Sequence, residues 1–123
     1  MESYLIMVVE NSIAVRELIA FTLERQGYKV VKAEDGLDAL KKLDDNRPNL
    51  IFTDLNMPNM NGIELIREVR AKSSFRFIPI IVVTTETRTS EKKQEAKAAG
   101  ATAWITKPFK KDQILTVVKK ILG

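Results

Sequence analysis

The alternation of short apolar runs with segments typical of helices is the feature that most constrains the fold of this chain. The runs are apolar along nearly their whole length, as strands buried on both faces of a sheet are, and they cover residues 4–9, 28–33, 49–54, 80–84 and 102–106. Each run is followed by a segment with apolar residues at helical spacing or with a capping residue at its start. These segments predict helices from a Ser12 cap to Gly27, over 37–43 after an Asp35 cap, over 62–71, from a Ser90 cap to Gly100, and over 110–122.

Strands that alternate with helices predict a parallel sheet covered by helices on both faces, with right-handed crossovers. A length of 123 residues is that of one domain, so we expect residues 1–123 to form a single α/β domain with no separate output domain. In such sheets, functional side chains gather at the carboxyl ends of the strands.

Composition excludes several classes of site. The chain has no cysteine and no histidine, which excludes disulfides, thiol nucleophiles, histidine-based triads and most zinc sites. The apolar runs are too short to cross a bilayer, and the first residues lack the pattern of a signal peptide, so we expect a cytoplasmic protein that does not bind membranes.

Polar side chains follow four of the predicted strands. The first strand ends in Glu10 and Asn11, the third in Asp54, the fourth in Thr84 and the fifth in Lys107. This set suits the transfer of a phosphoryl group to a carboxylate. An aspartate can act as the nucleophile, while a lysine, a hydroxyl and a divalent cation neutralise the incoming charge. Carboxylate and amide oxygens are ligands that Mg²⁺ accepts.

Four motifs at these strand ends give a family resemblance. In chain order they are VVENS, TDLNMPNMNG, VVTTE and AGATAWITKPF. The chain resembles the receiver domains of two-component response regulators over essentially its full length, and it is most similar to short, stand-alone receivers of the chemotaxis type. This resemblance implies a flavodoxin-like, doubly wound fold of five parallel strands in the order 2-1-3-4-5, with five helices.

The resemblance implies a role for several residues. Asp54 is the expected phosphoacceptor, and Thr84 is the switch hydroxyl that turns inward to bond the phosphoryl group. Lys107 pairs with Asp54 and then with a phosphoryl oxygen, and a cis peptide bond joins it to Pro108. Trp104 occupies the position of the switch aromatic, whose ring moves between exposed and buried positions as Thr84 moves.

The expected magnesium ligands depart from the family pattern at one position. They are Glu10, Asn11, Asp54 and the backbone carbonyl of Asn56, while Asn56 and Glu86 flank the site where the family tunes autodephosphorylation. Asn11 replaces an acidic residue. Because a charge pair at 4 Å is worth roughly 1 kcal/mol in water and about 4 kcal/mol at an effective dielectric near 20, we expect magnesium affinity to fall about tenfold or more. Glu10 is one methylene longer than aspartate and could reach inward to compensate.

The function implied by the resemblance is a signalling switch. A histidine kinase or phosphotransfer protein supplies the phosphoryl group, and a target reads the face formed by the fourth helix, the fifth strand and the fifth helix. That target is a motor switch component, a kinase complex or another relay protein. We expect a monomer, with dimerisation on activation left open, that catalyses only its own phosphorylation and autodephosphorylation.

Three alternatives follow from other features. A degenerate receiver would signal without phosphate, through its interaction surface. A magnesium phosphatase would need a second acid two residues after the nucleophile, where this chain has Asn56, and an insertion to enclose its substrate. The net charge of +4 suggests nucleic acid, but the charges are spread out and no recognition helix or stacking platform is evident, so we expect no nucleic-acid binding.

Overall fold

The computed structural model describes residues 3–87 and 91–123. In these ranges five strands form one parallel sheet in the order β2-β1-β3-β4-β5. The strands are β1 (Leu5–Val9), β2 (Lys29–Ala33), β3 (Leu50–Thr53), β4 (Ile80–Thr84) and β5 (Ala103–Thr106). The helices are α1 (Ile13–Glu24), α2 (Gly36–Asn46), α3 (Gly62–Ala71), the short 3₁₀ helix η1 (Ser73–Phe75), α4 (Glu91–Ala99) and α5 (Lys111–Leu122). The predicted fold class and strand order are confirmed.

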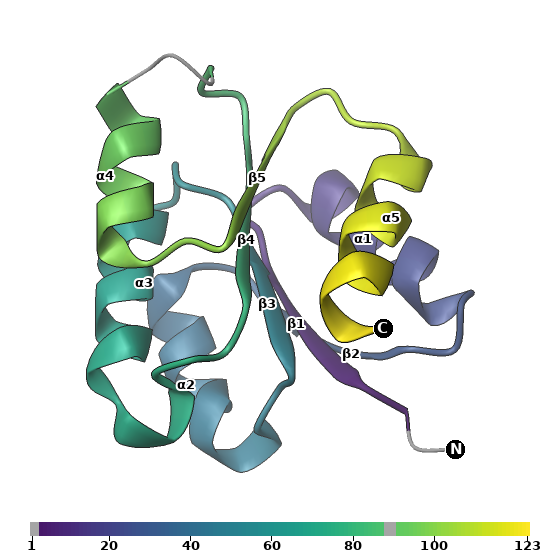
Figure 1. Cartoon of the computed structure of the whole chain (residues 1–123), viewed down its shortest axis with the longest axis horizontal. Helices are drawn as coiled ribbons and strands as arrows, with labels where there is room; N and C mark the ends of the chain where they lie inside the picture. The colour runs from purple at the N-terminus through teal and green to yellow at the C-terminus, as the bar shows by residue number, and fades with distance from the viewer. Residues whose placement is uncertain (1–2, 88–90) are drawn as a thin grey trace.

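The sheet separates two apolar cores. Helices α2, α3 and α4 cover one face, and α1 and α5 cover the other (Figure 1). Successive side chains of a strand point to opposite faces, so Met7 and Val9 of β1 pack beneath α2 and α3, while Ile6 and Val8 pack beneath α1 and α5. In the described ranges, none of the helices has the length and apolar character of a membrane span.

The start signals of two helices are confirmed. The Ser12 hydroxyl accepts a hydrogen bond of 3.3 Å from the backbone N–H of Val15, and the Asp35 carboxylate accepts one of 2.9 Å from the N–H of Asp38. These side chains satisfy backbone donors that have no partner inside the first turn. The predicted cap at Ser90 lies outside the described residues.

Three helical elements differ from the prediction. Helix α1 ends at Glu24 and does not continue to Gly27. Helix α2 continues beyond residue 43 to Asn46. The prediction ended too early because the last turn is polar and solvent-exposed and gives no apolar signal in the sequence. The helix then ends at Arg47, whose φ of 47° is left-handed. The 3₁₀ helix η1 was not predicted; it buries Phe75 through a single turn that is too short to show a period.

A tight connection joins β3 to α3 and brings Gly62 against the end of the strand. The N–H of Gly62 donates to the carbonyl of Leu55 at 2.9 Å. A β-carbon at position 62 would lie 2.8 Å from the Leu55 Cα and would also contact the carbonyl oxygen of Asp54. Backbone atoms cannot rotate away from such a contact, so only glycine allows this approach.

We therefore expect Gly62→Ala to lower the free energy of unfolding by about 1–3 kcal/mol, the usual cost of overpacking. Urea denaturation followed by circular dichroism measures this change. The control is Glu68→Ala, which alters an exposed side chain of the same helix and should change stability by no more than about 0.5 kcal/mol. Equal effects of the two substitutions would contradict the close approach.

Candidate functional site

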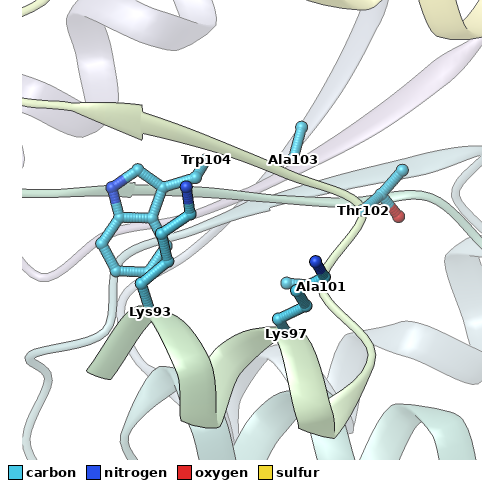
Figure 2. Close-up of a pocket in the computed structure, with 6 residues that line it drawn as sticks. All are labelled: Lys93, Lys97, Ala101, Thr102, Ala103 and Trp104. Carbon is cyan, nitrogen blue, oxygen red and sulfur yellow. The ribbon is translucent and has the colours of Figure 1, made fainter. Parts of the chain in front are cut away.

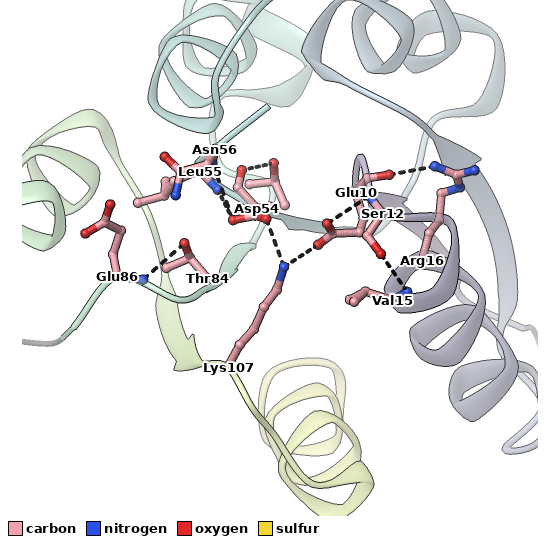
Figure 3. Close-up of polar contacts among 11 residues, drawn as sticks. Glu10, Ser12, Val15, Arg16, Asp54, Leu55, Asn56, Thr84, Glu86 and Lys107 are labelled. Atoms are coloured by element: carbon pink, nitrogen blue, oxygen red, sulfur yellow. Dashed lines mark hydrogen bonds and ion pairs between the residues drawn. The ribbon is translucent and has the colours of Figure 1, made fainter. Parts of the chain in front are cut away.

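The ammonium group of Lys107 joins two carboxylates at the carboxyl ends of the strands. Lys107 follows β5, and its Nζ lies 2.9 Å from an Oε of Glu10, which follows β1, and 2.9 Å from an Oδ of Asp54, which follows β3 (Figure 3). Glu10 is 3% exposed and Asp54 is 8% exposed. Three residues predicted from separate strand ends thus form one buried ionic cluster.

Backbone N–H groups fix the orientation of Asp54. Its Oδ1 accepts hydrogen bonds from the N–H of Leu55 at 2.6 Å and from the N–H of Asn56 at 3.4 Å, while its Oδ2 faces Lys107. Both oxygens of the Asp54 carboxylate are therefore held by hydrogen bonds.

The carboxylate of Glu10 turns inward, as the sequence suggested it could. Its Oε1 accepts from the N–H of Ser12 at 3.2 Å, while Arg16 donates to the Glu10 backbone carbonyl at 2.7 Å. Burial raises the pKa of the Glu10 carboxyl above its ordinary value; the Lys107 hydrogen bond opposes this rise and the neighbouring Asp54 charge adds to it. By contrast, the side chain of Asn11 is exposed.

Lys107 remains the cation of this cluster. Burial alone would lower the pKa of its ammonium group, but the hydrogen bonds to Asp54 and Glu10 outweigh burial and raise that pKa. The backbone N–H of Lys107 donates to the carbonyl of Thr84 at 2.7 Å, and the peptide bond to Pro108 is cis, as predicted.

Thr84 and Trp104 lie on the same face of the sheet. Thr84 pairs with Thr106 and Val82 pairs with Trp104 on adjacent strands, so these four side chains point toward α3 and α4. Thr84 is fully buried, and its hydroxyl oxygen accepts a bond of 3.4 Å from the N–H of Glu86. The two predicted switch residues are therefore neighbours in one packed layer.

A pocket of about 300 Å³ lies beside Trp104, between α4 and β5. Lys93 and Lys97 line it from α4, with Lys93 beside the indole ring and Lys97 beside Ala101 (Figure 2). The ring is partly exposed, and its Nε1 is buried without a hydrogen-bond partner in the described part of the chain. Trp104 was predicted on the face that a target reads, but this pocket was not predicted, because it depends on the spacing of a helix and a strand.

The oxygen groups near Asp54 fit a hard cation. The carboxylates of Glu10 and Asp54 meet at Lys107, and the other predicted ligands are the exposed Asn11 amide and the backbone carbonyl of Asn56. All four are oxygen groups of the kind that Mg²⁺ accepts. In residues 3–87 and 91–123, no group of three or more His, Cys, Asp or Glu side chains could hold a metal. A magnesium site here would thus combine two carboxylates with amide and carbonyl oxygens.

One contact of Asp35 has no signal in the sequence. Asp35 was predicted only as a helix cap, but its second oxygen accepts a hydrogen bond of 2.8 Å from the side chain of Asn59. Asn59 has a φ of 67°, in the left-handed region that asparagine tolerates better than most residues. The asparagine at position 59 of the NMPNMNG motif is compatible with this backbone conformation, but it does not indicate that its side chain contacts Asp35.

Comparisons with known proteins agree with this geometry. The sequence profile of the response regulator receiver domain matches residues 6–119. The chemotaxis protein CheY1 of Helicobacter pylori is 41% identical over 120 residues, which make up 96% of each chain.

Solved structures give the same result. The chemotaxis protein CheY4 of Vibrio cholerae superposes with a TM-score of 0.92 at 41% identity, covering 98% of this chain and 99% of that one. The receiver domain of a sensor histidine kinase from Pseudomonas aeruginosa, which holds a magnesium ion in its active-site cleft, has a TM-score of 0.88 at 26% identity and 97% coverage of both chains. With its fold and its strand-end cluster, this chain belongs to the response regulator receiver domains and is of the CheY type.

Proposed function

We propose that this receiver is a switch that accepts a phosphoryl group on Asp54 from a histidine kinase or phosphotransfer protein. The observation that carries the proposal is the buried Asp54 carboxylate, held by two backbone N–H groups on one oxygen and by Lys107 on the other. This arrangement supplies an oriented nucleophile and a cation for the incoming negative charge.

The transfer needs few groups from the protein. A carboxylate oxygen of Asp54 forms a bond to phosphorus as the bond between phosphorus and the donor nitrogen breaks. Lys107 neutralises charge on the phosphoryl oxygens, and the hydroxyl of Thr84 donates a hydrogen bond to one of them. Glu10, Asn11, Asp54 and the carbonyl of Asn56 would hold Mg²⁺, which supplies further charge neutralisation when bound.

The signal leaves through the face formed by α4, β5 and α5. When Thr84 turns toward the phosphoryl group, the space that it vacates lies in the same layer as Trp104. Movement of the indole ring then changes the pocket bordered by Lys93 and Lys97. A packed layer of this kind has discrete arrangements, so phosphorylation biases an equilibrium between two of them.

The chemotaxis proteins among the relatives support a target in motility or a related relay. A motor switch component, a kinase complex and another relay protein remain the candidate targets. As in other receiver domains, the chemistry of the chain is confined to its own phosphorylation and autodephosphorylation.

One observation favours a second function, that of a receiver working without phosphate. Asn11 is exposed and uncharged, and the Glu10 carboxylate is already paired with Lys107. If that pairing excludes Mg²⁺, the chain would act through its interaction surface alone.

Phosphorylation of Asp54 is tested by intact mass spectrometry after incubation with acetyl phosphate, with and without Mg²⁺. We expect a magnesium-dependent gain of one phosphoryl group, and we expect Asp54→Ala to abolish it. Asp112→Ala, which removes an exposed carboxylate from the first turn of α5, should leave the gain intact. No gain at high magnesium would refute the phosphorylation switch and favour the phosphate-independent receiver.

The substitution Asn11→Asp tests how much the uncharged amide at position 11 weakens magnesium binding. Restoring a full charge beside the site should tighten Mg²⁺ binding by roughly tenfold or more, as measured by isothermal titration calorimetry. Asn46→Asp is the control, because it adds the same charge to an exposed position at the end of α2, where salt screens it beyond about 10 Å at 0.1 M ionic strength. Unchanged affinity in Asn11→Asp would show that Glu10 compensates fully.

A further inference from the structure

Residues 56–60 lie in the connection between β3 and α3 and include the backbone carbonyl proposed to hold Mg²⁺. The side chains of Asn56, Pro58 and Asn59 are exposed, so burial of these residues contributes little to fixing the backbone. The N–H of Met60 donates to the carbonyl of Pro58 at 2.7 Å within the connection, and at its start the N–H of Asn56 donates to Asp54 Oδ1 over a long 3.4 Å. Met57 and Met60 pack against the core, and contacts with distant parts of the chain add to these in positioning the segment.

Asp35 makes such a contact. Within the described ranges, the hydrogen bond of 2.8 Å from the Asn59 amide to Asp35 Oδ2 is the one that links residues 56–60 to a distant part of the chain. Asp35 is 6% exposed. The N–H of Asp38 and the amide of Asn59 hold the pKa of its carboxyl below the ordinary value, so it is a charged acceptor at neutral pH.

Helix capping alone does not require this contact. The cap of α2 uses only Oδ1 of Asp35, which accepts from the N–H of Asp38. Ser12 caps α1 with a single oxygen. The second oxygen of Asp35 is therefore available to accept from the amide of Asn59. The two partners, one on each oxygen, explain why a carboxylate stands at this position in place of a hydroxyl.

A steric contact beside the hydrogen bond brings the same two segments together. Gly36, the first residue of α2, approaches Met60 so closely that a β-carbon there would lie 2.7 Å from the Met60 Cγ and 2.9 Å from its carbonyl oxygen. Met60 is partly buried against the core beneath α2 and α3. Two adjacent pairs thus fix the loop against the start of α2.

We propose that Asp35 and Asn59 form a positioning pair for the magnesium site, holding residues 56–60 so that the Asn56 carbonyl stays beside Asp54. The inference rests on the proposed magnesium site and adds two residues that do not contact the metal. Partners that orient metal ligands commonly contribute 10- to 100-fold to metal affinity.

The test uses two substitutions that break the pair from opposite sides. Asp35→Ser keeps a residue that caps helices well but leaves no second oxygen for Asn59. Asn59→Gly removes the amide and keeps a residue that adopts positive φ readily. Calorimetric titration with Mg²⁺, without phosphodonor, should show binding weakened roughly tenfold in each variant and no further weakening in the double variant, because both changes remove one interaction.

Arg47→Gly is the matched control, since Arg47 also has positive φ but lies at the far end of α2. It should leave magnesium affinity unchanged. Amide hydrogen exchange supplies a metal-free readout, because the amides of Asn56 and Met57 should exchange faster in both pair variants than in the control. Circular dichroism identifies a temperature at which every variant is folded, and the titrations are carried out at that temperature.

The outcomes separate the two proposals. If the wild-type protein binds Mg²⁺ and both pair variants bind it with the same affinity, the positioning role is overturned. This holds even if the variants have lower unfolding free energies, because loss of a helix cap alone would lower stability without changing magnesium affinity. Absence of magnesium binding in the wild-type protein would overturn the proposed site and the positioning role together.

Discussion

The bridge from Lys107 to Glu10 and Asp54 is the interaction on which the site depends. Two carboxylates in contact with one ammonium group would repel each other without it, and burial strengthens that repulsion. Removal of one partner from a buried ion pair typically costs about 3–5 kcal/mol. The chemistry proposed for Asp54 and the stability of this end of the sheet therefore depend on the same cation.

The fold explains why a lysine serves here. In the strand order β2-β1-β3-β4-β5, β1 and β3 are neighbours, so Glu10 and Asp54 follow adjacent strands. β5 is separated from β3 by β4, and the cation must cross the end of β4 to reach both carboxylates. The long side chain of Lys107 does so from a backbone anchored to the carbonyl of Thr84. Thr84, which lies in the same packed layer as Trp104, is thereby hydrogen-bonded to the residue that carries the cation.

Much of this arrangement could be predicted from the sequence, because a parallel sheet places its strand ends together. The apolar runs identified the strands, and the residues after them, such as Glu10, Asp54 and Lys107, identified the cluster. What could not be predicted depends on packing between segments distant in sequence. The Asn59 contact of Asp35 and the pocket beside Trp104 are examples, because periodicity reports which face of an element is buried but not which side chain it meets.

The central claim is that Lys107 neutralises both carboxylates in the metal-free protein and is released from that role when Mg²⁺ and a phosphoryl group arrive. A crystal structure grown with Mg²⁺ and beryllofluoride, a phosphoryl mimic, tests this most directly. The account predicts beryllofluoride on Asp54, Mg²⁺ in contact with Asp54 and the Asn56 carbonyl, and the Lys107 ammonium group moved from Glu10 to a fluorine of the mimic. A structure in which Lys107 still bridges Glu10 and Asp54, with neither Mg²⁺ nor the mimic bound, would contradict it.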